Sequence, residues 1–178
     1  MSEISYTMGA AVNGASSLYP AFAEAMNQFG YDWEPMTVTT EDNYILTTFH
    51  ILGKTGEPRN ATLGSVLIQH GRQQDGTSWI TNYEVDDKGF QLLLVDEGYD
   101  VWIGNNRGTR YSWGHETLDA NEEAYWNFSW AEMGLYDDPA NITAIKQETG
   151  EDKIFYIGYS QGTGQMHYGL SHLDDSFH

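Results

Sequence analysis

The stretch that most constrains the fold is KIFYIGYSQGT, residues 153–163. Its first half, residues 154–157, is β-branched and aromatic, which is typical of a buried strand. Ser160 then stands between Gly158 and Gly162, the spacing of a sharp turn that joins a strand to a helix and exposes the serine hydroxyl. Such a turn strains the backbone of the serine, and only small flanking residues leave room for it. The pattern therefore predicts Ser160 as a nucleophile.

The segment after this turn has the periodicity of a helix, because Met166, Leu170 and Leu173 recur at intervals of four and three residues. The first N–H groups of that helix would point toward Ser160, where a negatively charged oxygen develops during acyl transfer. An ordinary strand-to-helix turn with an incidental serine is the alternative interpretation. The strand signal before the motif and the helix signal after it favour the catalytic one.

The charge of the chain argues against two classes of partner. Among 178 residues, 26 are acidic and eight are basic, which gives a formal charge of -18. Nucleic acid and anionic membrane surfaces would be repelled, so neither is expected as a partner. The chain has no cysteine, and no apolar run approaches the roughly 18 residues of a membrane-spanning helix. Gly53-Lys54-Thr55 lacks the earlier glycine of a phosphate-binding loop, so no nucleotide cofactor is expected.

The rest of the chain alternates between strand and helix signals. Residues 1–19 have no periodicity and are expected to be a loose lead-in to a short helix that begins at Pro20 and stops at Gly30. A second helix is predicted over residues 90–97, closed by Gly98, and a third from Asp138, as N-cap, to Gly150. The predicted strands are residues 36–40, 44–52, 64–69, 99–104 and 154–157.

From residue 64 onward the order is strand, helix, strand, helix, strand, helix. That alternation predicts an α/β fold with a mostly parallel sheet, helices on both of its faces, and an antiparallel hairpin at its N-terminal side. The polar loop 105–114 carries Arg107 and Arg110. We expect these arginines to pair with nearby carboxylates rather than with substrate.

Five stretches, in this order, resemble the acid lipase family, the α/β-hydrolases that include gastric and lysosomal acid lipases. They are TTEDNYIL (39–46), LIQHG (67–71), GYDVWIGNNRG (98–108), EMGLYDDPANI (132–142) and YIGYSQGT (156–163). The resemblance covers nearly the whole chain and implies the N-terminal part of an α/β-hydrolase fold. Residues 1–30 would be a lead-in with a short helix, and residues 31–178 a partial lipase domain that ends after the helix following the serine.

The resemblance implies hydrolysis of a lipid ester, triacylglycerol or steryl ester, by acyl transfer to Ser160. Gly158 and Gly162 would shape the turn around this serine. The backbone N–H of Gln161 would be one oxyanion donor and that of Arg72, after the His-Gly pair, the other. Each such donor is worth about 2.7 to 4 kcal/mol of barrier. Neither a metal nor another cofactor is implied.

One departure from the family concerns the loop that would carry the second donor. The family usually has leucine after the His-Gly pair, whereas this chain has Arg72, Gln73, Gln74 and Asp75. A backbone donor does not depend on its side chain, so the oxyanion hole is still expected. One wall of the acyl pocket would become polar, and a smaller or more polar ester is therefore a weaker alternative substrate.

A second departure is the length of the chain after the serine. In α/β-hydrolases an Asp or Glu and then a His follow the nucleophile, yet only 18 residues follow Ser160. His167 and His172 would lie roughly 10 and 18 Å along the helix axis, and we expect both at the surface. His70 is expected to shape the oxyanion loop. The other late candidates are Asp174, Asp175 and His178, and no complete triad is visible.

We therefore expect the N-terminal half of a lipase, inactive by itself, whose serine strand forms an open edge toward a missing C-terminal half. The alternative is a non-catalytic half-domain that binds lipid or a protein partner. Sequons for N-glycosylation at Asn60, Asn127 and Asn141 lean slightly toward a secretory route. A secreted or lysosome-like location is expected, although the first twenty residues lack the pattern of a signal peptide.

Overall fold

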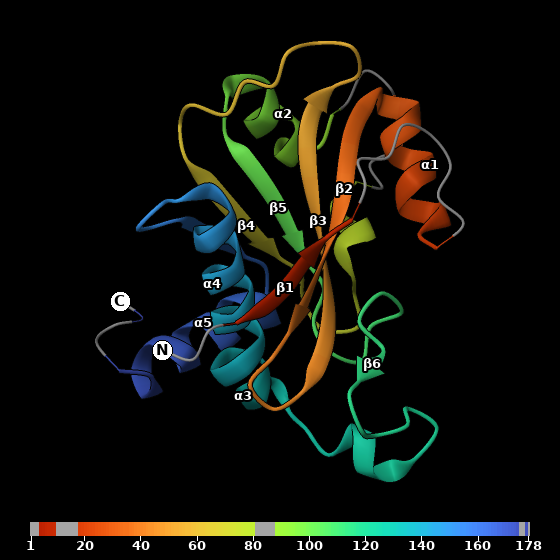
Figure 1. The fold of residues 1–178 in the computed structure, drawn as a ribbon, viewed down its shortest axis with the longest axis vertical. Helices are drawn as coiled ribbons and strands as arrows, with labels where there is room; N and C mark the ends of the chain where they lie inside the picture. The colour runs from red at the N-terminus through yellow and green to blue at the C-terminus, as the bar shows by residue number, and fades with distance from the viewer. Residues whose placement is uncertain (1–3, 10–17, 81–87, 175–176, 178) are drawn as a thin grey trace.

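The computed structural model describes residues 4–9, 18–80, 88–174 and 177. Its centre is a seven-stranded sheet in the order β1-β2-β3-β5-β4-β7, with the short β6 paired to β3 (Figure 1). The strands are β1 Ser5–Met8, β2 Tyr31–Thr39, β3 Tyr44–Lys54, β4 Ser65–Gln69, β5 Asp100–Gly104, β6 Gly114–His115 and β7 Phe155–Gly158.

The sheet is mixed. Strands β5, β4 and β7 run parallel to one another, whereas β1, β2, β3 and β5 pair antiparallel in succession. The predicted parallel sheet with an N-terminal antiparallel hairpin is present, but its antiparallel part has two additional strands. One is β1, which lies in the segment predicted to be a loose lead-in and pairs with β2. The other is the short β6, which pairs with β3.

Helices cover both faces of the sheet, as the alternation of elements predicts. The longer helices are α1 Pro20–Phe29, α2 Phe90–Glu97, α4 Asp138–Thr149 and α5 Gln161–His172; shorter turns are η1 Gly76–Trp79, η2 Glu123–Trp126, α3 Trp130–Glu132 and the π-helical η3 Met133–Asp137. Left-handed glycines at residues 30, 98 and 150 end α1, α2 and α4, as expected from the sequence.

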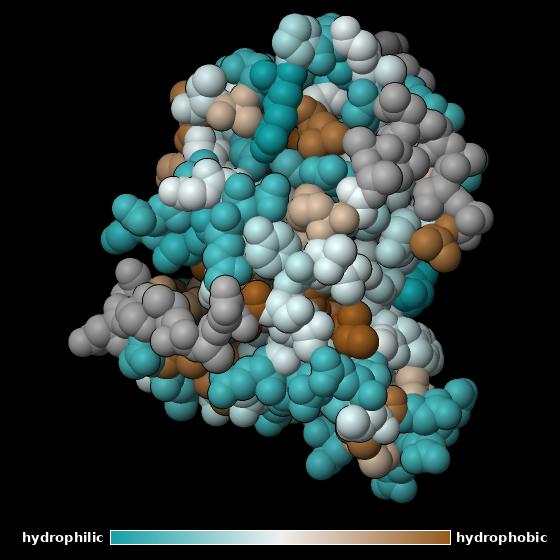
Figure 2. Space-filling model, in the orientation of Figure 1, coloured by the Kyte–Doolittle hydropathy of each residue, from teal (hydrophilic) through white to brown (hydrophobic). Residues whose placement is uncertain are grey.

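Two hydrophobic cores lie on opposite faces because successive side chains of a strand alternate. Val66 and Ile68 of β4 pack on the face covered by α1 and α2, whereas Leu67 between them packs on the face covered by α4. Trp102 of β5 joins Leu67 on that second face. All five residues of β4 and of β5 are buried, as expected for strands covered on both sides. The face shown in Figure 2 is largely hydrophilic, with small separate hydrophobic patches.

Strand β2 begins at Tyr31, five residues before the predicted start. The predicted strand starts directly after Pro35, a residue that lacks the N–H that a strand ladder needs. In the structure the carbonyl oxygen of Pro35 accepts a hydrogen bond from the N–H of Gly9, just past the end of β1. The position where Pro35 lacks an N–H therefore lies at the end of the pairing between β1 and β2, and β2 continues through the proline.

The predicted N-cap at Asp138 is wrong. The helical run begins at Trp130, where Ser129 and Glu132 form a capping box, and it passes through the π-helical turn η3 into α4. Pro139 therefore lies in the first turn of α4 but in the middle of a longer helical segment. The π-helical turn comes directly before the proline segment and accommodates it, because the register of the hydrogen bonds changes there. The Asp138 side chain is then buried instead of capping.

Candidate active site

The serine turn lies between the end of β7 and the start of α5. Ser160 has φ 52° and ψ −112°, a backbone conformation that serine rarely adopts, and its side chain is exposed. The flanking glycines are required by close backbone approaches. A Cβ at Gly158 would lie 2.6 Å from the nitrogen of Thr163, and one at Gly162 would lie 2.5 Å from the carbonyl oxygen of Gln69. The strained geometry expected from the motif is therefore present.

The loop after β4 lies directly against this turn. A Cβ built on Gly71 would be 3.2 Å from the Cβ of Ser160, and Tyr159 N–H donates to the Gln69 carbonyl at 3.0 Å. Gln74 closes the loop on itself, since its Oε1 accepts from Gly71 N–H at 3.0 Å and its N–H donates to the Gly71 oxygen at 3.3 Å. No pattern in the sequence indicates this role for Gln74.

Two backbone N–H groups beside the serine have no partner in the described part of the chain. Among the residues that the structure describes, neither the N–H of Arg72 nor that of Gln161 donates a hydrogen bond. Most backbone N–H groups of a folded protein are paired with protein or with water. Gln161 is the first residue of α5, so its N–H is one of the free donors at a helix N-terminus. These are the two donors that the sequence resemblance implies.

A cavity of about 940 Å³ opens over these groups. One wall is polar and comes from the loop after β4, with Arg72, Gln73 and Gln74, as the sequence predicts. The other wall is apolar and comes from two aromatic residues of the segment before α3, together with Met133 of η3. Gln161 Nε2 contacts the Met133 sulfur at 3.1 Å. The cavity can therefore contact an apolar group of a bound molecule with one wall and a polar group with the other.

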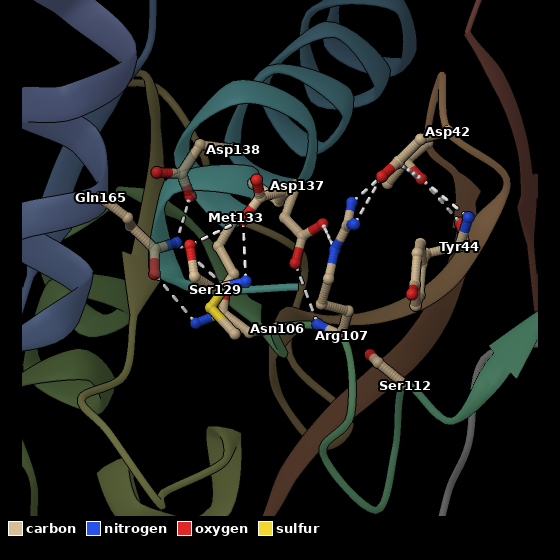
Figure 3. Close-up of polar contacts among 12 residues, drawn as sticks. Asp42, Tyr44, Asn106, Arg107, Ser112, Ser129, Met133, Asp137, Asp138 and Gln165 are labelled. Atoms are coloured by element: carbon tan, nitrogen blue, oxygen red, sulfur yellow. Dashed lines mark hydrogen bonds and ion pairs between the residues drawn. The ribbon is translucent and has the colours of Figure 1, made fainter. Parts of the chain in front are cut away.

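Both arginines of the loop after β5 pair with carboxylates, as predicted. Arg110 Nε lies 2.7 Å from Asp75 at the cavity. Arg107 is wholly buried: its Nε is 2.7 Å from Asp137 and its Nη2 donates to Asp42 at 2.8 Å (Figure 3). Burial alone would lower the pKa of Arg107, but the negative charges of Asp137 and Asp42 raise it above its usual value. Arg107 therefore stays charged inside the protein.

The described histidines offer no free base beside Ser160. His70 is buried, its Nδ1–H donates to the Gly71 oxygen at 2.8 Å, and its Nε2 accepts the N–H of Asn106 at 3.1 Å. Burial lowers the pKa of His70, which keeps the ring neutral. His167 and His172 lie exposed on α5, as expected. Asp174 is exposed, just past the end of α5, and the remaining candidates Asp175 and His178 lie outside the described residues.

Two further sequence features have clear outcomes. The sequons at Asn60 and Asn127 are exposed, but Asn141 is only 1% exposed and its Oδ1 accepts a hydrogen bond from Thr48 at 2.6 Å. Asn141 is therefore closed to a glycan in the folded chain. Within the described part of the chain, no three His, Asp or Glu side chains gather as metal ligands do, and no helix is both long and apolar enough to cross a membrane.

Comparison with known proteins places the chain in a family. Residues 64–178, more than half of the sequence, match the family described as "alpha/beta hydrolase fold". The chain belongs to this family. Residues 22–83 also match "Partial alpha/beta-hydrolase lipase region". The predicted fold class is confirmed, and the match to a lipase region supports the lipase resemblance inferred from five short stretches.

Among curated relatives, lipase member M of Mus musculus is 40% identical over 88% of this chain and 37% of its own length. The lysosomal acid lipase/cholesteryl ester hydrolase of Homo sapiens is 39% identical over 79% of this chain and 35% of its own length. Lipase lipl-5 of Caenorhabditis elegans is 38% identical over 93% of this chain and 41% of its own length. The α/β-hydrolase chain described here thus spans between a third and about two fifths of these relatives.

A solved structure has a similar fold. The Pyrococcus furiosus esterase Pf2001 superposes with a TM-score of 0.57 at 20% sequence identity, covering 83% of this chain and 49% of that one. At this identity the likeness concerns the fold alone. In the α/β-hydrolase chain, β7 has β4 as its one partner among the described strands, so the serine strand lies at an edge of the sheet, as predicted.

Proposed function

We propose that this protein hydrolyses carboxylic esters by acyl transfer to Ser160. One observation carries the proposal: an exposed serine in a strained turn lies against a loop, and each of the two elements offers an unpaired backbone N–H. An oxyanion hole needs donors of this kind, fixed before the reaction and aimed at one oxygen. The membership of the chain in the α/β-hydrolase family supports the same assignment.

In the proposed reaction the Ser160 oxygen attacks the ester carbonyl carbon, and a base accepts the hydroxyl proton. The carbonyl oxygen becomes an oxyanion and accepts hydrogen bonds from the N–H groups of Arg72 and Gln161. Collapse of the intermediate breaks the bond to the alcohol, which leaves with a proton from the protonated base. Water then attacks the acyl-serine by the same route in reverse, releasing the acid and restoring the hydroxyl.

We assign the base and its carboxylate partner to chain beyond the present one. The relatives are two to three times longer, and the free edge of β7 has room for further parallel strands of the same sheet. An apolar groove of about 470 Å³ runs along β7 and α5, lined by Ile154, Met166 and Leu170. Added strands and helices of a complete fold would cover this groove.

We further propose a lipid ester, such as triacylglycerol or steryl ester, as substrate. The relatives are named as lipases and a cholesteryl ester hydrolase, and the apolar wall of the cavity suits an acyl chain. The polar wall formed by Arg72, Gln73 and Gln74 favours an ester with a polar group beside the reacting carbonyl. A secreted or lysosome-like location fits these relatives, and the exposed sequons at Asn60 and Asn127 are open to glycans there.

The test is labelling of the natural protein, isolated from its source, with a fluorophosphonate probe that reacts with activated serines. Ser160→Ala should abolish both labelling and hydrolysis of a long-chain ester. Ser171→Ala is the matched control, since Ser171 is an exposed serine of the same helix and bonds only to neighbours on α5. We expect it to change neither. Labelling or turnover that survives Ser160→Ala would overturn the proposal.

The 178-residue chain should be almost inactive in the same assay. Loss of the base costs about 10⁶ in turnover in serine hydrolases of this kind, leaving a residual rate from binding and the oxyanion hole. Robust turnover by this chain would show that the base lies within it. An intact natural protein of the same mass as this chain, with no label, would instead favour a non-catalytic half-domain.

A further inference from the structure

A series of buried polar contacts connects the loop that carries the Arg72 N–H with the helix that carries the Gln161 N–H. Its centre is a reciprocal amide pair: Asn106 Nδ2 donates to Gln165 Oε1, and Gln165 Nε2 donates to Asn106 Oδ1, both at 3.0 Å (Figure 3). Asn106 belongs to the loop after β5 and Gln165 to α5. Both side chains are at most 2% exposed, so solvent cannot replace these bonds without opening the core.

On one side, the series of contacts reaches the loop that carries Arg72. The backbone N–H of Asn106 donates to His70 Nε2, and His70 Nδ1–H donates to the carbonyl oxygen of Gly71. That carbonyl and the N–H of Arg72 belong to the same planar peptide unit. Fixing the Gly71 oxygen therefore fixes the direction in which the Arg72 N–H points.

On the other side, the series of contacts reaches α5 itself. Gln165 lies one turn after Gln161, whose N–H is the second free donor. Gly134 and Gly169 let η3 and α5 approach backbone to backbone, since a Cβ on Gly169 would lie 2.5 Å from the Gly134 oxygen. The helix is thus held rigidly at the position from which Gln165 projects.

Asp138 completes the anchoring of Gln165, because its Oδ1 accepts the second Nε2 proton at 2.8 Å. Tyr156 has a single hydroxyl proton, and its oxygen lies 2.8 Å from the Gly162 carbonyl and 3.3 Å from Asp138 Oδ2. The Tyr156 hydroxyl therefore also lies against the second carboxyl oxygen of Asp138. Burial raises the pKa of Asp138 well above its usual range.

We propose that Gln165 is a positioning residue that, through Asn106 and His70, aligns the peptide bearing the Arg72 N–H with the helix bearing the Gln161 N–H. The catalytic meaning of this alignment rests on the proposed ester hydrolysis. The alignment itself is a property of the folded chain and can be measured without turnover.

The first measurement needs no variant. The imidazole nitrogen signals of His70 in the NMR spectrum of the 178-residue chain distinguish the two neutral tautomers. The contacts require hydrogen on Nδ1 and none on Nε2, which must accept the Asn106 N–H. A single Nδ1–H tautomer is expected. A neutral ring with hydrogen on Nε2 would overturn the proposal.

The second measurement uses Gln165→Met, which keeps the length and helix propensity of the side chain but removes its amide. Exchange of the Asn106 N–H with solvent should accelerate about tenfold, the factor for loss of roughly one net hydrogen bond. Exchange at Val66 to Ile68 in the centre of β4 should not change. His167→Ala, an exposed substitution on the same helix, is the control and should match the wild type. Unchanged protection of Asn106 N–H in Gln165→Met would overturn the proposal.

In the natural protein, Gln165→Met should lower kcat by up to about 100-fold, within the range for an impaired oxyanion donor, and leave KM nearly unchanged. If Gln165→Met only reduced the folded fraction, it would lower the amount of active enzyme. The molecules that remain folded would then keep the wild-type pH profile and the wild-type His70 tautomer. Equal kcat in the wild-type protein and in Gln165→Met would overturn the positioning role. Failure of the proposed function would be seen separately, as hydrolysis that survives Ser160→Ala.

Discussion

Replacing Arg107 by methionine should be among the most destabilising single changes in the described part of the chain. The guanidinium joins the hairpin turn at Asp42, the loop after β5, and Asp137 of η3, and its Cζ lies 3.9 Å from the centre of the Tyr44 ring. Arg107 and Asp137 both have side chains that are 0% exposed. Arg107→Met keeps much of the apolar stem but removes the cation, and so leaves a buried carboxylate without its charged partner.

Removing one partner of a buried ion pair costs about 3–5 kcal/mol, because the remaining charge is neither paired nor hydrated. Asp42 adds little to this cost, since its side chain is 29% exposed and can be hydrated. With a urea m-value of about 2 kcal/mol per molar, the unfolding midpoint at pH 8 should fall by about 1.5–2.5 M. Chemical denaturation followed by tryptophan fluorescence measures this shift.

The loss should depend on pH. Burial raises the pKa of Asp137 to about 6 even with Arg107 in place. At pH 8 the Asp137 carboxylate of the wild type is charged and paired with Arg107. At pH 5 it is largely protonated, so its interaction with Arg107 contributes less to the stability of the fold. Arg107→Met should therefore cost more stability at pH 8 than at pH 5. Equal losses at the two pH values, or a loss below about 1 kcal/mol at pH 8, would refute the reasoning.

The double variant Arg107→Met with Asp137→Asn supplies the internal control. The asparagine keeps an oxygen that can accept the backbone N–H of residue 107, which Asp137 accepts at 2.9 Å, but it carries no charge. We expect it to recover most of the stability lost in the single variant, because burying a neutral hydrogen-bonded amide costs far less than burying an unpaired carboxylate. If the double variant is no more stable than Arg107→Met, the loss is due to packing and not to the charge.

Three further predictions concern stability. Ser160→Gly should raise the free energy of unfolding by about 1 kcal/mol in urea titrations, because relief of about 1–3 kcal/mol of strain exceeds the backbone entropy that glycine adds; a less stable variant would contradict it. Burial alone would lower the pKa of His50, but hydrogen bonds to Asp100 and Glu34 raise it. His50→Gln should therefore lose more stability at pH 5 than at pH 9, since the wild-type contribution disappears as pH rises through the raised pKa; a pH-independent loss would contradict it. Gly134→Ala should lower the melting temperature through about 1–3 kcal/mol of overpacking against α5, and an unchanged melting temperature would show that η3 can shift.

Local signals in the sequence were sufficient for much of the fold. The stops at Gly98 and Gly150 depend on a conformation that glycine adopts most easily, and both helices end there. The serine turn was predictable for a similar reason, since Gly158 and Gly162 mark backbone approaches that no other residue allows. Such features are encoded within a few residues, so a single sequence reveals them.

Features that depend on distant partners could not be predicted in this way. Residues 5–8 become a strand only because β2 offers an edge more than twenty residues later. Asp138 followed by proline has the local pattern of a helix start, but the capping box at Ser129 begins the helix earlier and tertiary packing buries the carboxyl. The pairing of Asn106 with Gln165 joins residues 59 positions apart, and neither amide has a local signal that indicates it.

Backbone strain in the described residues is concentrated where the site is proposed. Three non-glycine residues have positive φ: Asn43 at 70°, Gln73 at 59° and Ser160 at 52°. Asn43 lies in the hairpin turn between β2 and β3, and asparagine tolerates this conformation readily. Glutamine and serine have no such preference, so tertiary contacts must hold Gln73 and Ser160 in place. Each is next to one of the two unpaired N–H groups, that of Arg72 and that of Gln161, which is the arrangement expected when strain is retained to aim donors at a reacting atom.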